Sequence, residues 1–492
     1  MSTATLYYEK ELSFISNMLN LLRGGNYHKM NHIIKAKSNI ILPIIIVIVS
    51  VFYVTLIFNQ NIWTDEAFTI DLVNSGSVPD IISGTANDVH PPLYYLICKF
   101  FVSIFGSSIQ VYKIVSIIPM VLTMLLAVFY IKPWFGQKSS VLFVLFFNAI
   151  PCVLEYSVQI RMYSWSIFFI TLCSLSAYGI ASNHRNVHWV LLSLSALCAC
   201  YTHNFAMISA VFIYLLLGIA LIVKARKLPA KWFLSGAFVS VCFLPWLLIL
   251  LRQTTDRVNN YWIEKITLET VAEYFSDLFD SRLPFSTVMF VVLFLLILIL
   301  SVRNTKKSEK QEGIYVLCLF LVPLLTAFTG IMVSILITPF FIARYLIPCM
   351  GLLALALAIG FSKENLATRI ILCAFLVTMF LNSYYTNYID EYHSSHTQEL
   401  LTYMSENLGE NDLILYNYKQ YGFVYECYFD NDQLRYLEEM DFASDYDTIW
   451  YFDSCTSPWL PDATLTEYGL TKEYIATLGI EQNDFILYKI TR

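Results

Sequence analysis

Long apolar stretches, separated by short polar connections, make up most of this chain. A helix that crosses a hydrocarbon core of about 30 Å needs roughly 20 mainly apolar residues. We therefore expect eleven membrane spans, at Ile40–Phe58, Gln110–Ile131, Ser139–Leu154, Met162–Ala181, Val187–Tyr201, Ala206–Val223, Trp232–Leu251, Pro284–Val302, Gly313–Ile335, Tyr345–Phe361 and Ile370–Tyr385. The pattern predicts a polytopic α-helical membrane protein.

One shorter apolar run, Pro92–Phe105, has two interpretations. It is 14 residues long and contains Lys99, which fits either a short span or an interfacial helix. If it does not cross, the basic connections between spans all fall on one side, which is then cytoplasmic. With this choice, residues 1–38 lie in the cytoplasm, the loop 59–109 lies on the extracytoplasmic side, and the spans form a membrane domain at 39–386.

The composition changes at the tail, residues 387–492, which is rich in Asp, Glu and Tyr and has no run of span length. Short apolar segments predict strands at 412–416, 447–452 and 484–490. Helices are expected at 397–407 and 421–429. We expect a small α/β domain on the extracytoplasmic side.

Composition agrees with the membrane class and narrows the partners. Hydrophobic residues make up 57% of the chain and charged residues 14%, against about 25% charged in soluble proteins. The net charge of -6 leaves no basic excess for nucleic acid, which is not an expected partner. The cysteine spacing fits neither a disulfide framework nor a zinc site, although Cys427 and Cys455 in the tail are able to pair outside the cytoplasm.

The first external loop carries ionisable residues at both ends. It opens with Asp65 and Glu66 and closes with Asp88 and His90 before a double proline. Each end alone has a structural explanation, because carboxylates often cap helices and prolines often start them. Their occurrence in one loop, on the side that holds the other polar motifs, favours a functional site.

Five motifs occur in order along this side of the chain: Trp63-Thr-Asp65-Glu66, Asp88-Val-His90-Pro-Pro-Leu-Tyr94-Tyr, Tyr156-Ser-Val-Gln159-Ile-Arg161-Met-Tyr163, Tyr201-Thr-His203-Asn-Phe and Ala343-Arg344-Tyr345-Leu-Ile-Pro348. Together they resemble the bacterial GT-C-type glycosyltransferases, which include relatives of the dolichyl-phosphate-mannose protein mannosyltransferases and the lipid A aminoarabinose transferases. The resemblance extends to about Phe361. It implies a lipid-phosphate sugar donor, action outside the cytoplasm and inversion of the anomeric centre.

The resemblance implies that Asp65 is the catalytic base. Because a phosphate leaving group departs as a stable anion, the reaction needs no acid, and one carboxylate suffices. A general base contributes roughly 10²–10⁴ in rate, and Glu66 would orient the loop or the acceptor. Many relatives carry an acidic residue where this chain has Gln159, and Glu155 either replaces that acid or caps the end of a span.

The departing phosphate needs fixed positive charge, which arginine supplies through paired hydrogen bonds. Arg344 lies in an apolar run, where an unpartnered charge costs about 2.5–3.5 kcal/mol; the alternative is an arginine that only extends to the interface. Arg161 is a second candidate, or simply a residue at a helix end. Other candidates for contacts with the donor phosphate or substrate are Asp88, His90, Tyr94 and Tyr345.

His203 is either a structural residue between two spans or, with Asp88, a ligand of a divalent metal ion, the one cofactor considered. The sequence thus favours a glycosyltransferase of a bacterial plasma membrane. Its partners would be a polyprenyl-phosphate sugar, membrane lipids and a glycan, lipid or protein acceptor. The alternatives are an inactive homologue and a transporter or flippase, although transporters place their charges near the midplane and often contain repeats, and we find none here.

Overall fold

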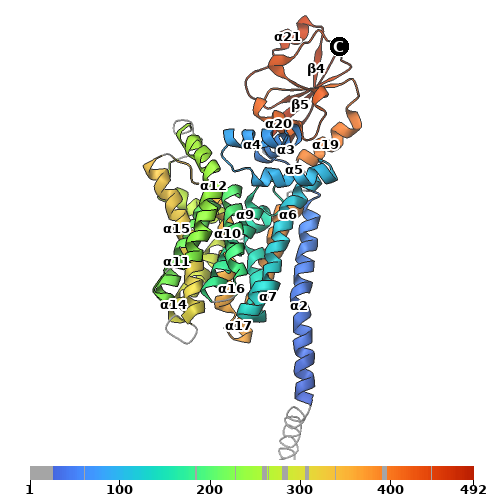
Figure 1. Cartoon of the computed structure of the whole chain (residues 1–492). Coiled ribbons are helices and arrows are strands. Elements are labelled where there is room, and N and C mark those ends of the chain that lie inside the picture. Colours follow the sequence, from blue (N-terminus) through green and yellow to red (C-terminus); the bar gives the residue numbers. More distant parts are fainter. Residues whose placement is uncertain are drawn as a thin grey trace, which may run out of the picture.

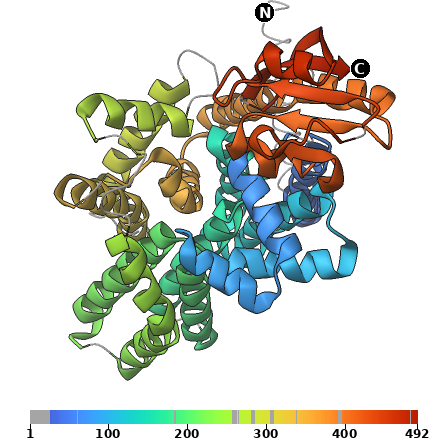
Figure 2. The ribbon, with the colours of Figure 1, turned by 90° about the horizontal axis from the view of Figure 1, so that it is seen from above.

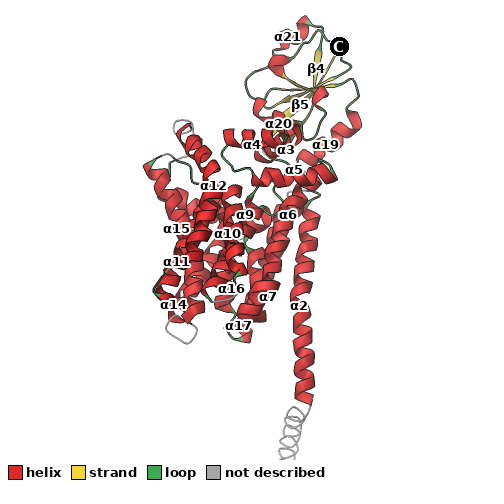
Figure 3. Ribbon diagram, in the orientation of Figure 1, coloured by secondary structure: helices red, strands yellow, loops and turns green. Residues whose placement is uncertain are grey.

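The computed structural model describes residues 26–59, 61–182, 185–227, 229–256, 263, 265–279, 286–304, 310–337, 339–390, 396–444, 446–481 and 483–492. Among these residues, helices form the body of the protein, and the strands lie together in the carboxy-terminal part (Figures 1 and 3). Of the sequence predictions, residues 1–25 and Pro284 lie outside the described residues.

The body consists of apolar helices that run side by side (Figure 1). They are α2 (Asn26–Leu56), α6 (Ile109–Leu126), η1 (Ala127–Ile131), α7 (Lys132–Ala149), α8 (Pro151–Glu155), α9 (Tyr163–Ala181), α10 (Val187–Thr202), α11 (Asn204–Ala225), α12 (Ala230–Asp256), α14 (Ser286–Asn304), α15 (Lys310–Leu336), η2 (Ala343–Cys349), α16 (Met350–Phe361), α17 (Leu366–Tyr384) and η3 (Tyr385–Asp390).

In the described part of the chain, seven helical stretches are long and apolar enough to cross a membrane, and four apolar helices are shorter. The chain is therefore an integral membrane protein, and each predicted span falls on one of these helices. The stretch Ile109–Ala149 covers two predicted spans. Its helix breaks at Gly136, where φ is 87° and ψ is 169°, a conformation that favours glycine.

The chain reverses at this glycine. At the start of α6, the Lys113 ammonium donates to the carbonyl of Asn59, and near the end of α7, Asn148 accepts a hydrogen bond from the Tyr53 hydroxyl. Asn59 and Tyr53 both lie at the carboxyl end of α2. Both ends of the long helical stretch therefore lie at the same face of the bundle, as two separate spans require.

The centre of the bundle is α16, which is apolar around its whole circumference and almost entirely buried. Its close approach to α9 depends on Gly351. A Cβ atom at this position would lie 2.0 Å from the Thr171 hydroxyl oxygen. Small residues allow such close backbone contacts between membrane helices, so this glycine fixes the distance between the two spans.

Three helices lie across one end of the bundle, crosswise to the spans: α3 (Thr64–Ser75), α4 (Val78–Asn87) and α5 (Leu93–Phe105) (Figure 1). The Lys99 ammonium of α5 donates to the Val73 carbonyl of α3 at 2.8 Å. This arrangement favours the interfacial interpretation of the run Pro92–Phe105. A further short helix, α13 (Leu268–Phe279), precedes α14.

The tail forms a five-stranded sheet in the order β2-β1-β3-β5-β4. Strand β1 pairs in parallel with β2 and β3, and β5 pairs antiparallel with β3 and β4. The elements are α19 (His396–Asn407), β1 (Leu413–Tyr416), η4 (Lys419–Tyr421), α20 (Gly422–Tyr425), η5 (Asn431–Gln433), β2 (Leu434–Tyr436), η6 (Leu437–Glu439), β3 (Ile449–Asp453), α21 (Asp462–Glu467), β4 (Thr471–Ile480) and β5 (Asn483–Thr491).

The three predicted strands coincide with β1, β3 and β5, and the first predicted helix with α19. The second was too long, because α20 spans four residues and then ends in turns. Cys427 and Cys455 are both free thiols. The tail lies over α3 and one side of the bundle, as Figure 2 shows from above, and α20 packs directly against α3.

Candidate active site

The acidic pair of the first loop lies in the first turn of α3, which begins at Thr64 after the extended residue Trp63. Free backbone N–H groups and the helix dipole favour carboxylates at this position. The two side chains point to different surroundings. Glu66 is buried, whereas about a third of the Asp65 side chain, 35%, is exposed.

Glu66 joins two segments of the backbone. One carboxylate oxygen accepts the Ile160 N–H at 2.6 Å, and the other accepts the Trp63 N–H at 3.3 Å. Burial raises the pKa of Glu66, while the Lys113 charge and these two hydrogen bonds oppose the rise. These contacts fit the expectation that Glu66 orients the loop, and they also fit the simpler interpretation of a helix cap.

Asp65 faces two arginines that come from distant parts of the chain. Its Oδ2 lies 3.5 Å from a terminal nitrogen of Arg344 and 3.7 Å from one of Arg161. Both distances exceed those of direct hydrogen bonds, which are about 2.7–3.2 Å. The single carboxylate therefore attracts both guanidinium groups at short range without being locked into a paired geometry with either, and it offsets only one of the two positive charges.

Arg161 is committed mainly to the helix that carries Asp65. Its other terminal nitrogen donates to the Asp65 carbonyl at 2.9 Å and lies 3.3 Å from the Thr69 hydroxyl. Only 4% of the Arg161 side chain is exposed. This arginine therefore holds the start of α3 in place and contributes positive charge, with little surface left for a ligand.

Arg344 is the more accessible arginine, with 21% of its side chain exposed. It lies at the start of η2, and its guanidinium carbon is 5.1 Å from the centre of the Trp63 ring. Such cation–π contacts orient a guanidinium without using its hydrogen-bond donors. Among the described residues, the buried Arg344 Nε has no hydrogen-bond partner, and the exposed part of this side chain is open to an anionic ligand.

A polar cavity of about 440 Å³ adjoins Arg344. Glu155, Tyr156 and Asp277 contribute polar groups to its wall. Asp277 belongs to α13, which is fixed beside η2 because the Tyr274 hydroxyl donates to the Phe341 carbonyl at 2.9 Å. Glu155, a secondary candidate from the sequence, therefore lines the same cavity as Arg344, together with Asp277, which no sequence motif had indicated.

Aromatic rings surround His203 at the junction of α10 and α11. The rings of His90, Tyr163 and Tyr345 lie 5.6, 5.4 and 5.3 Å from it, centre to centre. The His203 Nδ1 accepts the Phe205 N–H at 3.1 Å, which places the proton of the neutral ring on Nε2. Burial, together with the charges of two arginines, lowers the pKa of His203 to about 3. His203 is therefore a neutral hydrogen-bond donor at physiological pH.

The remaining predicted residues are Tyr94, Asp88 and Gln159. Tyr94 is fully buried, and its hydroxyl pairs with Ser116 at 3.0 Å, so it is not placed to contact a substrate. Tyr95, which the sequence analysis did not select, lies near Arg161, and its buried hydroxyl has no hydrogen-bond partner among the described residues. Asp88 ends α4, where its N–H donates to Gly84 and Thr85. The Gln159 side-chain oxygen is buried and has no hydrogen-bond partner in the described part of the chain.

A metal ion finds no complete ligand set here. Within the described residues, no group of three or more His, Cys, Asp or Glu side chains is arranged to hold one. The pair considered from the sequence, Asp88 and His203, would thus need ligands from outside this set, since zinc sites use at least three protein ligands. We derive no chemical step through a metal.

Comparisons with known proteins agree with this architecture. Residues 89–249, about a third of the chain, match the family model described as dolichyl-phosphate-mannose-protein mannosyltransferase. The structure is similar to that of ArnT from Cupriavidus metallidurans bound to undecaprenyl phosphate, with a TM-score of 0.59 and 9% identity over 90% of this chain and 97% of that one. For ArnT in the apo state, the values are 0.56 and 10%, over 92% and 98%. No curated protein matches the chain.

These similarities confirm the predicted resemblance to the GT-C-type glycosyltransferases. At such low identity, the two solved structures support the fold alone. The segment that matches the family model contains Arg161 and His203 but neither Asp65 nor Arg344. The roles of these last two residues therefore depend on the geometry described above.

Proposed function

We propose that this protein transfers a hexose or pentose from a polyprenyl-phosphate donor to an acceptor hydroxyl, with Asp65 as general base and Arg344 as the ligand of the donor phosphate. The observation that carries this proposal is the 3.5 Å approach of these two side chains at a partly exposed site. A base and a phosphate ligand must share one pocket, because both act on groups attached to one anomeric carbon, and the two side chains then separate to admit the sugar between them.

The proposed reaction is a single displacement. Asp65 takes the proton of the acceptor hydroxyl while the hydroxyl oxygen forms a bond to the anomeric carbon. The bond between that carbon and the phosphate oxygen breaks on the opposite side, and the phosphate leaves with the electron pair. One displacement inverts the anomeric centre, and the leaving phosphate needs positive charge rather than a proton.

Arg344 would receive the phosphate through the donors that the protein leaves available. In the free protein Asp65 lies beside this charge. The phosphodiester of the donor carries one negative charge and gains a second as the sugar leaves, and its oxygens compete for the guanidinium because they accept paired hydrogen bonds. As Arg344 turns to the phosphate, the Asp65 carboxylate loses one of its two cationic neighbours and becomes a stronger base. Arg161 keeps α3 in place throughout, which makes it a positioning residue.

We place this reaction at the outer face of a bacterial plasma membrane. Lys224, Lys310 and Lys363 lie near the ends of α11, α15 and α16, remote from Asp65, and a basic side of this kind is normally cytoplasmic. A phosphate-linked polyprenyl donor is supported by the similar fold of ArnT, which was solved with undecaprenyl phosphate bound.

The test is a transfer assay with purified protein, acceptor-containing membranes and a panel of radiolabelled polyprenyl-phosphate sugars. Transfer by the wild type and its loss in Asp65→Asn would support the proposal. Asp71→Asn is the matched control, because Asp71 lies on the same helix and makes none of the arginine contacts described here. If sealed vesicles with either protein moved lipid-linked sugar across the bilayer without transferring it, the transporter alternative would replace this proposal.

A further inference from the structure

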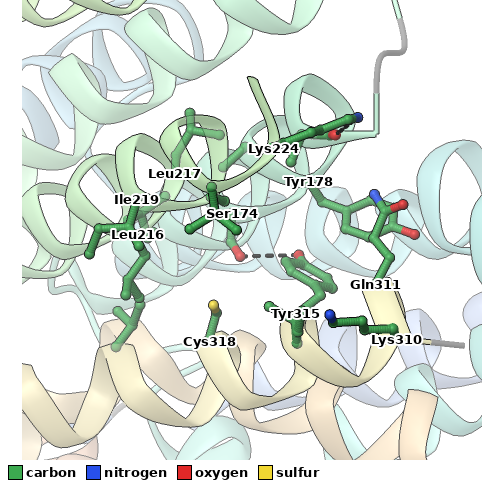
Figure 4. A pocket seen from close by; sticks show the side chains of 17 residues that line it. Ser174, Tyr178, Leu216, Leu217, Ile219, Lys224, Lys310, Gln311, Tyr315 and Cys318 are labelled. Atoms are coloured by element: carbon green, nitrogen blue, oxygen red, sulfur yellow. Dashed lines mark hydrogen bonds between the residues drawn. The ribbon is translucent and has the colours of Figure 1, made fainter. Parts of the chain in front are cut away.

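A second cavity lies between the membrane helices α9, α11 and α15 and has a volume of about 480 Å³. Most of its wall consists of aliphatic side chains, among them Ile213, Leu216 and Leu217. Figure 4 shows Leu216, Leu217 and Ile219 on one side of the cavity, with Lys224, Lys310 and Gln311 together at the other. The cavity is thus apolar along its length and basic at one end. These two properties complement a single amphipathic ligand that has an apolar part and a negatively charged group.

The basic end is far from the candidate active site. Helix α11 begins at Asn204, next to His203, and its 22 residues end at Ala225. At 1.5 Å per residue, this helix is about 33 Å long, close to the thickness of the hydrocarbon core. Lys224 therefore lies at the opposite membrane face from Asp65, and this cavity is separate from the proposed donor site.

Lys224 is held at the rim of the cavity. Its ammonium donates to the carbonyl of Ala181, the last residue of α9, at 2.7 Å. A lysine ammonium has three N–H donors, so two are left for a ligand. The hydrogen bond also places the charge at the carboxyl end of a helix, where the dipole stabilises a cation. The position of this charge is therefore fixed by the fold.

Lys310, the first residue of α15, provides the second charge. None of the described residues that line the cavity is acidic. Of the carboxylates near Lys310 in the sequence, Glu309 lies outside the described residues, and Glu312 is paired with Lys363 at 2.8 Å. The two lysines thus present an excess of positive charge that the wall of the cavity does not neutralise.

We propose that an anionic phospholipid of the surrounding membrane binds this cavity, with an acyl chain along the aliphatic wall and its phosphate between Lys224 and Lys310. A neutral lipid would make no use of the two lysines, and a small polar anion would make none of the apolar wall. The sugar donor is a poor match, since its phosphate has to reach Asp65 at the other face. Only the exclusion of the sugar donor rests on the proposed function; the match to an anionic phospholipid rests on the wall and charges of the cavity.

The experiment measures lipid binding to the purified full chain by native mass spectrometry, with phosphatidylglycerol and phosphatidylcholine as the two probes. Near a membrane surface each lysine contributes about 1 kcal/mol to the attraction of an anionic lipid. The double variant Lys224→Gln/Lys310→Gln should therefore weaken the first bound phosphatidylglycerol by about tenfold or more, and phosphatidylcholine by less than about twofold.

The matched control is Lys227→Gln/Lys231→Gln, which removes the same charge from the same face but from outside the cavity. The control should keep phosphatidylglycerol binding within about twofold of the wild type. Equal losses in the two double variants, or no loss in either, would overturn the inference, because the attraction would then be a general property of the basic face.

A second variant tests the apolar part. Ala220→Trp places a large side chain in the cavity wall and should weaken both lipids, while elution volume and melting temperature report whether the protein still folds. If a folded Ala220→Trp protein bound phosphatidylglycerol as the wild type does, the lipid would lie elsewhere. Tighter binding of undecaprenyl phosphate than of phosphatidylglycerol, lost in Lys224→Gln/Lys310→Gln, would also contradict the choice of ligand.

Discussion

The Asp65 carboxylate lies 3.5 Å from the guanidinium of Arg344, although one residue follows the first membrane helix and the other follows α15. Only the folded bundle brings them together. Because Asp65 is partly exposed and Arg344 has free donors, both side chains can exchange their mutual contact for contacts with a ligand. This property distinguishes the pair from a purely structural ion pair, which is normally closed to solvent.

Asp65→Asn should lower the turnover number by roughly 10²–10⁴, the usual contribution of a general base. The amide keeps the shape of the side chain but cannot accept the proton, so the donor KM should change far less than the turnover number. Steady-state kinetics with the active donor would measure both. Asp71→Asn should stay close to the wild type, and a turnover number within about threefold for Asp65→Asn would remove Asp65 from the proposed role.

Arg344→Ala should raise the donor KM by about 10- to 100-fold, because a hydrogen bond to a charged group contributes about 1.5–3 kcal/mol. Arg344→Lys keeps the charge but loses the planar fork, so it should recover only part of the affinity. The measurement is the donor KM at constant salt. Arg435→Ala, in the tail, is the control; an unchanged KM in Arg344→Ala would show that the phosphate binds elsewhere.

Glu66→Ala should destabilise the protein by about 1–3 kcal/mol, because it leaves the buried Ile160 N–H without its acceptor. Glu66→Gln should lose less, since an amide oxygen can still accept this bond. Thermal melting in detergent measures the difference, with the exposed Glu473→Ala as the control. Equal melting temperatures for Glu66→Ala and the wild type would mean that this link contributes nothing to the fold.

Because of His203, we expect the stability of the folded protein to fall as the pH is lowered. Its pKa is lowered to about 3 by burial and by Arg161 and Arg344, whereas an unfolded histidine titrates near 6.5. Between these values, the unfolded chain takes up a proton and the folded protein does not. The contribution of neutral His203 to the free energy of unfolding is therefore fully present above pH 6.5 and is lost as the pH drops towards 3. At pH 5 the free energy of unfolding is lower by about 2 kcal/mol.

The measurement is the change in melting temperature between pH 7.5 and pH 5. His203→Gln should show a smaller decrease than the wild type, because the glutamine does not titrate. The exposed His396→Gln should show the wild-type decrease. The same decrease in all three proteins would mean that His203 is accessible to protons, contrary to its buried position.

Gly351→Ala should destabilise the bundle by about 1–3 kcal/mol, because the new methyl group would meet the Thr171 hydroxyl and push α16 away from α9. Gly236→Ala in α12 is the control, since a Cβ at that position meets no atom of the described structure within 4 Å. Melting temperatures compare the two variants. If both behave alike, the close contact between these spans is not required for stability.

The spans were predictable because a hydrophobic core of fixed thickness imposes both length and composition on a helix. The same constraint does not act on the tail. The burial pattern of strand β4 alternates poorly, and much of the strand is exposed. Strand β2 has only three residues. Neither could therefore be recognised as a strand from the sequence. Of the three predicted strands, β1 and β3 are buried on both faces and consist of continuous apolar runs, whereas β5 alternates between buried and more exposed residues.

The candidate site was predictable only in part. Motifs pointed to Asp65, Arg161 and Arg344, which the fold brings together. Asp277 was missed because it belongs to a loop helix without a recognisable motif, and only tertiary packing places it in the cavity wall. Tyr94 and Tyr95 show another limit: neighbouring residues on a helix point in different directions, and the sequence alone does not say which one faces Arg161.

The contact between α20 and α3 has a consequence for the order in which the protein matures. Helix α3 emerges early in translation, while Arg344 and then α20 follow only after most of the membrane helices have been made. A nascent chain with its first spans inserted thus carries Asp65 before Arg344 and α20 have been made. The ribosome has to finish nearly the whole polypeptide before these three can come together, so under the proposed function a prematurely terminated chain would lack the complete site.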